Sequence, residues 1–334
     1  MIKNIFIFFT VVMLFTACTK KDYAFFLQGN AQGTSYHITY ISKDKIVSEK
    51  EIDSLLADID ASMSTWLPNS IISRINNNEK NVVIDTYFKT VFNKAVEVSE
   101  KTKGDFDITV GPLINAWGFG PTQKKSLNQN QVDSLLQVVN YKLLSLNGNQ
   151  IIKEKPEIKI DFNAIAQGFS VDVVAAFLEK KGIENYLVEL GGEIKAKGKK
   201  EKAAWKVGIE QPDEEDSSER KLQAILNLDN RALATSGNYR KFYREGTQRF
   251  SHIINPKTGY PAKHTLLSTT VIANDAITAD AYATAFMVMG LQKAIAFVEK
   301  NKALNLEVYF IYDKNGKWKT YISPGLIKRI KKTF

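Results

Sequence analysis

The chain has 334 residues, of which 44% are hydrophobic and 24% charged, and its formal net charge is +9. This length and apolar content allow one large domain or two ordinary ones and exclude a largely disordered protein. The lysines are spread along the chain without zinc-finger spacing or an aromatic nucleic-acid motif, so the charge does not indicate nucleic-acid binding.

The N-terminal segment 1–17 is predicted to be a signal peptide, with an apolar run over 5–15 that is too short to be a permanent membrane span. Cys18, which follows it, is the only cysteine, so no intramolecular disulfide can form. The segment resembles a bacterial lipoprotein lipobox, although Phe15 stands where leucine is usual. We expect lipid attachment at Cys18, a tether over 18–24, a folded domain over 25–334, and export to the periplasmic face of a bacterial membrane.

The first element of the predicted domain is a strand over 34–41, because polar and apolar residues alternate there. His37 falls among apolar and aromatic neighbours in this strand, and we assign it a structural role. Ser48 and Glu51 have the spacing of a capping box, which predicts that a helix begins there.

Candidate ligand contacts follow in two places. Trp66 ends a polar run, where it could stack on a flat ligand ring or anchor the core. Asp105 and Asp107 lie two apart between glycines and aromatic residues. These carboxylates could accept hydrogen bonds from a ligand or hold a turn.

A predicted strand over 158–162 runs into the small-residue turn 163–168 and then a helix over 169–181. A strand, a short turn and a helix N-terminus can form a phosphate-binding site, because the unsatisfied N–H groups of the first helical turn face the ligand. Residues 187–192 are predicted to form another strand, which ends in paired glycines before Glu193.

The segment 231–261 combines two turn-forming stretches. Residues 234–238 contain two hydroxyls, a glycine and an amide, a composition that favours an anion-binding turn. His252 follows, just before a Pro-x-Thr-Gly turn. Because imidazole titrates near neutral pH, His252 is a candidate proton-transfer group, and a structural role in capping the turn is the alternative.

Near the C-terminus, Asp280 and Thr284 lie four apart on an alanine-rich predicted helix and so share one face. Oxygen ligands without cysteine or histidine suit Mg²⁺, and a buried Asp–Thr hydrogen bond is the alternative. Strands over 306–313 and 317–322 are predicted to form a hairpin. With no repeat and no linker, the sequence predicts an α+β fold, a single domain of mixed β-sheets flanked by helices.

Eight segments in chain order resemble the ApbE family, the FAD:protein FMN transferases, or flavin transferases. They are AQGTSY (31–36), SMSTW (62–66), GDFDITVGPLINAWGFG (104–120), IDFNAIAQGFSVD (160–172), LVELGGEI (187–194), ALATSGNYR (232–240), HIINPKTGYP (252–261) and DAITADAYATAFMVMG (275–290).

The resemblance implies a Mg²⁺-dependent exported enzyme that cleaves FAD, transfers FMN to a threonine of a partner flavoprotein and releases AMP. It implies that Asp280, Thr284 and the backbone carbonyl of Ala164 bind the metal and that His252 activates the acceptor hydroxyl. The residues that it places against FAD are Gln32, Trp66, Asp105, Phe106, Asp107, Asp161, Gln167 and Ile254.

Three of these positions depart from the common family pattern. Gln167 stands where lysine is common, Trp66 where tyrosine is common, and Gln32 where methionine is common. Two other functions stay open: an FAD pyrophosphatase that uses water as the acceptor, and a non-enzymatic flavin-binding lipoprotein. The acceptor expected from the family is an exported or membrane respiratory electron-transfer subunit.

Overall fold

The computed structural model describes residues 21–120, 127–212, 221–238, 242–245, 248–251 and 253–334. Its largest element is an eight-stranded sheet in which every strand pair is antiparallel. In spatial order its strands are β1 (Tyr23–Ala31), β2 (Thr34–Ser42), β5 (Asn185–Leu190), β6 (Glu193–Lys197), β9 (Arg231–Gly237), β12 (Leu266–Ala273), β13 (Glu307–Lys314) and β14 (Lys317–Ile322).

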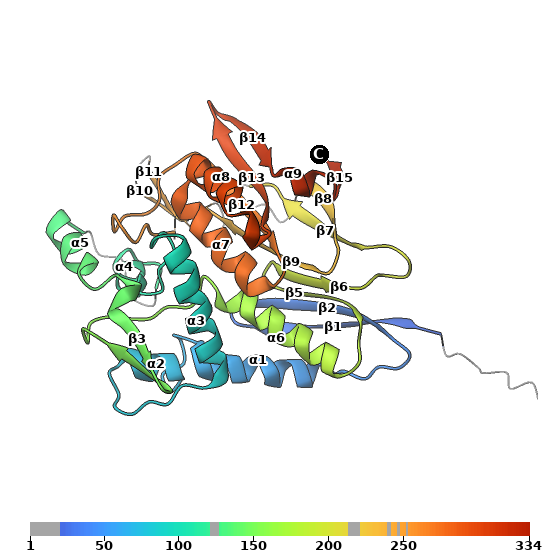
Figure 1. Ribbon diagram of the computed structural model, residues 1–334, viewed down its shortest axis with the longest axis horizontal. Helices are drawn as coiled ribbons and strands as arrows, with labels where there is room; N and C mark the ends of the chain where they lie inside the picture. The colour runs from blue at the N-terminus through green and yellow to red at the C-terminus, as the bar shows by residue number, and fades with distance from the viewer. Residues whose placement is uncertain (1–20, 121–126, 213–220, 239–241, 246–247, 252) are drawn as a thin grey trace, which may run out of the picture.

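Helices cover one face of this sheet (Figure 1). The long ones are α1 (Glu49–Met63), α3 (Thr86–Lys101), α6 (Ala166–Lys180), α7 (Ala276–Met289) and α8 (Leu291–Lys300). Helices α6 and α7 pack directly on the sheet, and α3 packs on α1 and α7. The main core lies between these helices and the sheet and contains fully buried aromatic residues such as Phe88, Phe162 and Phe286.

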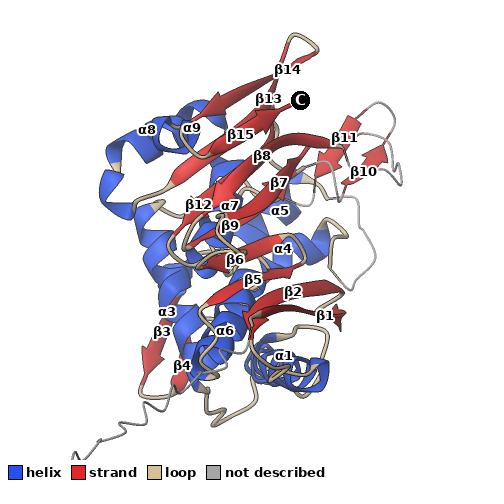
Figure 2. Cartoon of the chain, turned by 90° about the vertical axis from the view of Figure 1, so that its right-hand side faces the viewer, coloured by secondary structure: helices blue, strands red, loops and turns tan. Residues whose placement is uncertain are grey.

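A second, three-stranded sheet packs on the opposite face, as Figure 2 shows. Its strands are β15 (Ile330–Thr333), β8 (Leu222–Leu228) and β7 (Trp205–Glu210), in that order. Trp205 and Leu226 from this sheet and Leu233 from β9 belong to the apolar layer between the two sheets. The prediction of an α+β fold with helices flanking β-sheets is confirmed.

Smaller elements complete the described chain. They are α2 (Ile71–Asn76), α4 (Gly111–Ala116), α5 (Gln129–Leu136), η1 (Tyr141–Leu143), β3 (Leu144–Asn147), β4 (Gln150–Lys153), β10 (Phe242–Glu245), β11 (Gln248–Ser251), η2 (Lys302–Leu304) and α9 (Pro324–Ile327). Within the described ranges, no helix is both long enough and apolar enough to cross a membrane.

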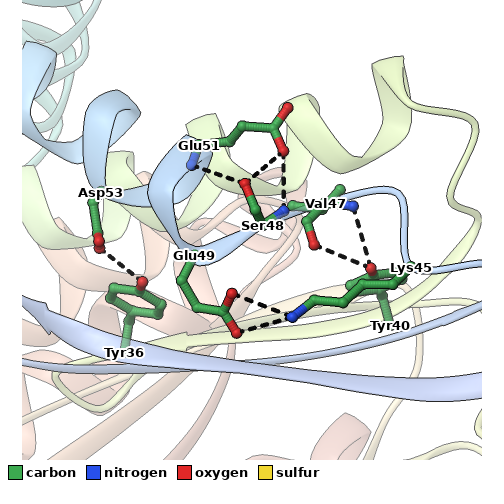
Figure 3. A network of polar contacts seen from close by, with 8 residues as sticks. All are labelled: Tyr36, Tyr40, Lys45, Val47, Ser48, Glu49, Glu51 and Asp53. Atoms are coloured by element: carbon green, nitrogen blue, oxygen red, sulfur yellow. Dashed lines mark hydrogen bonds and ion pairs between the residues drawn. The ribbon is translucent and has the colours of Figure 1, made fainter.

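Helix α1 is fixed to the sheet by the contacts drawn in Figure 3. The predicted capping box is confirmed, because the Ser48 side chain accepts from the Glu51 N–H while the Glu51 carboxylate accepts from the Ser48 N–H at 3.0 Å. The hydroxyl of Tyr36 on β2 donates to Asp53 of α1 at 2.7 Å.

The predicted C-terminal hairpin is also confirmed, with the turn at Asn315 and Gly316 between β13 and β14.

Two local predictions are wrong. Residues 158–162 form no strand, because the Asn76 side chain occupies the place of a neighbouring strand: its amide donates to the Ile160 carbonyl at 2.8 Å and accepts from the Ile160 N–H at 2.7 Å. Residues 234–237 form no turn but belong to β9, a central strand paired on both sides. The small side chains of Ala232 and Ala234 are fully buried, on the strand against which α7 packs.

His37 also lies in a different environment from the one predicted. The strand is confirmed as β2, but His37 is exposed on the outer face of the sheet, with Nδ1 2.8 Å from a carboxylate oxygen of Glu189.

Helices α6 and α7 approach each other closely at Gly168. A methyl group at this position would lie 2.3 Å from the Ala276 carbonyl oxygen and 2.7 Å from Cβ of Asp280, closer than nonbonded atoms can come. Only glycine therefore allows the two helix backbones to keep this distance.

Gly168→Ala is expected to lower the free energy of unfolding by about 2 kcal/mol or more, because the helices must separate. Gly208→Ala in β7 is a matched control, since the atoms nearest to its added methyl group all belong to the rotatable side chain of Leu222. Chemical denaturation of both variants measures the difference, and equal losses would show that the α6–α7 contact tolerates a side chain.

Candidate functional site

The candidate site begins where Asp280 of α7 meets the N-terminus of α6. The Gly168 N–H donates to Asp280 Oδ2 at 3.0 Å, and the Asp280 side chain is buried. This carboxylate takes the place of an N-cap side chain, which α6 lacks. Burial raises the pKa of Asp280 to about 7, and the hydrogen bond from the Gly168 N–H opposes this rise.

A second carboxylate makes the reciprocal contact. Asp172 of α6 accepts from the Ile277 N–H in the first turn of α7 at 2.9 Å and from Lys195 Nζ of β6 at 2.7 Å. Burial raises the pKa of Asp172, and Lys195 opposes that rise. Each helix thus carries a carboxylate that accepts a hydrogen bond from the first turn of the other helix, which fixes the crossing and the position of Asp280.

The other two predicted metal ligands belong to the same pair of elements. Thr284 follows Asp280 by one turn of α7 and is half-buried. Ala164 lies in the turn just before α6 and is also half-buried. Among the described residues, no group of three or more histidine, cysteine or acidic side chains could hold a metal. The predicted ligand set is instead one carboxylate, one hydroxyl and one backbone carbonyl.

Two turns of the sheet lie beside the N-terminus of α6. Gln32 and Gly33 form the β1–β2 turn with positive φ angles of 54° and 73°. The Gln32 amide donates to Ser170 of α6 at 2.9 Å, while its buried Oε1 has no hydrogen-bond partner among the described residues. Residues 30–35, which form this turn and the strand ends beside it, line an open hollow of about 540 Å³. At the β5–β6 turn, a methyl group on Gly191 would lie 2.8 Å from Gln167 Nε2.

The predicted Asp105–Phe106–Asp107 segment places its side chains in three environments. Asp105 forms an ion pair with Lys257 at 2.6 Å, and Phe106 is buried in the main core. Asp107 accepts from the N–H and hydroxyl of Thr109 at 2.8 and 2.6 Å and from the Tyr141 N–H at 2.9 Å. Asp107 therefore holds a turn, which was the alternative to a ligand contact. Burial raises the pKa of its carboxyl group, and these hydrogen bonds oppose that rise.

A second hollow, of about 520 Å³, lies beside this segment. Its lining includes Lys103, Gly104, Asp107, Tyr141, Pro256 and Lys257. The Asp105–Lys257 ion pair therefore joins the 104–107 segment to the 255–258 turn at this hollow.

Asp161 and Ile254, two further predicted FAD contacts, form contacts within the protein. The Asp161 carboxylate accepts from the Asn163 N–H at 2.7 Å, and its own N–H donates to the Ile108 carbonyl at 2.8 Å. Burial raises the pKa of Asp161. Ile254 is buried in a small apolar cluster with Trp117 and Leu113.

Trp66 is 67% exposed, so the alternative that it anchors the core is wrong. Two predicted positions, His252 and Cys18, lie outside the described residues.

Two acidic residues at this end of the sheet were missed as site candidates. Asp172, which is half-buried, was read only as part of a motif, and Glu193, which is 6% exposed, only as the residue after the paired glycines. The signal for Asp172 is an acidic residue among the apolar residues of α6, which is rare unless the charge is paired.

Comparison with known proteins extends the match from local motifs to the whole chain. The sequence profile described as the ApbE family matches residues 32–310. The FAD:protein FMN transferase of Haemophilus influenzae is 39% identical over 88% of each chain, and that of Vibrio cholerae is 36% identical over 94% of this chain and 95% of its own. The solved flavin transferase ApbE from Vibrio cholerae superposes with a TM-score of 0.81 at 35% identity, covering 92% of this chain and all of that one.

The two aspartates of the 105–107 segment are expected to differ in their effect on stability. Asp107→Asn should destabilise by about 2–3 kcal/mol, because the new amide group faces an N–H donor in either orientation. Asp105→Asn should cost no more than about 1 kcal/mol, because the partly exposed ion pair is screened by solvent. Thermal unfolding of both variants tests this, and an unchanged melting temperature for Asp107→Asn would contradict the structural role.

Proposed function

This chain belongs to the ApbE family, and on that premise we propose that it is an FAD:protein FMN transferase. It cleaves the pyrophosphate of FAD, joins FMN through a phosphoester bond to a threonine of an exported or membrane flavoprotein, and releases AMP. The observation that carries the proposal is the buried Asp280 held against the N-terminus of α6 in a chain that aligns with such transferases over most of its length.

The residues at this site fit Mg²⁺. Asp280 supplies a buried carboxylate whose negative charge a cation would offset, and Thr284 and the Ala164 carbonyl add neutral oxygen donors. When bound, Mg²⁺ supplies charge neutralisation at the pyrophosphate oxygens.

The chain's own contribution is orientation and electrostatics. The N-terminus of α6 presents partial positive charge toward an anion, as helix N-termini do. Gln167, Gln32 and the neighbouring turns would line the path of FAD. The Oε1 of Gln32, which no described residue hydrogen-bonds, would accept from a ligand donor. Because Gln167 is neutral where lysine is common in the family, phosphate binding here relies more on the helix N-terminus and the metal.

The transfer step needs a base for the acceptor hydroxyl, and by resemblance this role belongs to His252. A positioned histidine typically contributes about 10²–10⁴-fold to such a step. The acceptor is a threonine of a respiratory electron-transfer subunit, the class of partner that the family resemblance implies.

We further propose that the mature chain is exported and carried on a lipid attached to Cys18, on the periplasmic face of a bacterial membrane. The lone cysteine directly after a short apolar run supports this anchor.

The proposed activity is tested by incubating the mature chain with FAD and Mg²⁺, with and without an acceptor domain whose intact mass is followed. AMP together with a mass gain of one FMN is the expected result. AMP with free FMN and an unmodified acceptor would instead indicate the pyrophosphatase, and bound FAD without AMP would indicate a flavin-binding lipoprotein.

The metal role of Asp280 is tested with Asp280→Asn, which keeps the shape of the side chain. Mg²⁺ is expected to raise the melting temperature of the unchanged protein but not of the variant, and AMP formation should fall by at least about 100-fold, the scale for loss of an electrostatic contact to the transition state. Asp105→Asn serves as a control for the loss of one acidic charge in the Mg²⁺ melting experiment only, and an unchanged Mg²⁺ response in Asp280→Asn would remove Asp280 from the metal site.

His252→Ala is expected to bind FAD normally and to transfer FMN about 10²–10⁴-fold more slowly, because only proton abstraction is lost. FAD affinity is measured by flavin fluorescence and transfer by acceptor mass. Normal transfer would assign His252 a structural role.

A further inference from the structure

The two ends of the eight-stranded sheet differ in chemistry. The β1–β2 and β5–β6 turns, which belong to the candidate site, lie at one end. The other end contains the first residue of β1, the last of β2, the first of β5 and the connection after β6. The pairs Ala24–Ile41, Ile41–Asn185 and Tyr186–Lys197 place these four strand ends together. We call this second end, with its segments 21–23, 43–46 and 199–202, the tether end.

The tether end is basic and carries exposed apolar groups. Its three segments contain six lysines against three acidic residues, all exposed. Tyr23 is 56% and Ile46 41% exposed, and Phe26, three residues along β1, is 66% exposed. In Figure 1 the start of β1 lies at this end, beside the loops that follow β2 and β6.

The length of the preceding chain decides what can cover this surface. Five residue steps separate Cys18 from Tyr23, which span at most about 17 Å when fully extended. A lipid on Cys18 therefore keeps the start of β1 within that distance of the membrane. Tyrosine favours the membrane–water interface, and each lysine near an anionic surface strengthens association about fivefold.

We propose that the tether end lies against an anionic phospholipid surface, with Tyr23, Phe26 and Ile46 at headgroup level. This inference rests on the proposed lipid anchor. Because β1 has nine residues, it separates the tether end from the β1–β2 turn by about 25 Å. The candidate site then faces away from the lipid, and an acceptor threonine would have to lie about 25 Å above the membrane to enter it.

The test uses the full lipidated chain in vesicles of phosphatidylethanolamine and phosphatidylglycerol. Cys18 is the only cysteine and its thiol is taken by the lipid, so Phe26→Cys and, separately, Ile46→Cys each introduce a single thiol for a fluorescent label. Val83→Cys is the matched control, because Val83 is 60% exposed and lies outside the tether end. Labels at 26 and 46, but not at 83, are expected to be shielded from aqueous iodide and quenched by nitroxide lipids.

Charge reversal tests the basic contribution. Lys199→Glu with Lys200→Glu is expected to raise iodide quenching of the label at 46 at least about fivefold. Lys317→Glu with Lys319→Glu on β14, also exposed, should leave it unchanged.

Three results would overturn the inference. Vesicle-bound protein with equally exposed labels would exclude the membrane contact while keeping the anchor, and protein that fails to float with vesicles would exclude both. Shielding in native membranes but not in pure lipid would assign the surface to a protein partner. AMP formation from FAD, measured on the same protein in detergent, reports the proposed enzymatic function independently of all three.

Discussion

The structure depends on the crossing of α6 and α7, where the buried carboxylate of Asp280 and the half-buried carboxylate of Asp172 each meet the first turn of the opposite helix. An isolated buried carboxylate is costly, and so is a buried helix N-terminus with unpaired N–H groups. The hydrogen bonds from the Gly168 N–H to Asp280 and from the Ile277 N–H to Asp172 offset both costs. Each places a carboxylate charge at the positive end of a helix. The close approach at Gly168 makes these contacts possible, so packing and electrostatics require the same geometry.

This crossing explains how one set of residues serves both stability and chemistry. Asp172 has Lys195 as a second partner and is a structural group. Among the residues that the structure describes, no cationic side chain pairs with Asp280, which lies one turn from Thr284, so its charge is the one that a bound cation would balance. The reciprocal pair thus divides into one carboxylate that holds the fold and one that is available to a ligand.

The antiparallel sheet gives the molecule two functional ends. Turns with positive φ angles gather at the candidate site, where Gln32 and Gly33 let β1 reverse beside α6. The basic segments gather at the other end, where β1 begins five residues after Cys18. The nine-residue strand β1 separates the two ends, and the Tyr36–Asp53 contact and the capped helix α1 hold the sheet to its helices. With the proposed lipid anchor, the protein would be held at one end and act at the other.

Local sequence signals determined two elements whose stability is local, the capping box at Ser48 and the hairpin at Asn315–Gly316. The family motifs also identified Asp280 and Thr284 as candidate ligands. The sequence could not show that 234–237 belongs to a central strand, on which the small side chains of Ala232 and Ala234 admit α7, nor that Asn76 replaces a strand beside Ile160. It also could not separate Asp107, which holds a turn, from Asp105, which pairs with Lys257. Those roles depend on which distant groups the fold brings within hydrogen-bonding distance, and only the tertiary structure decides that.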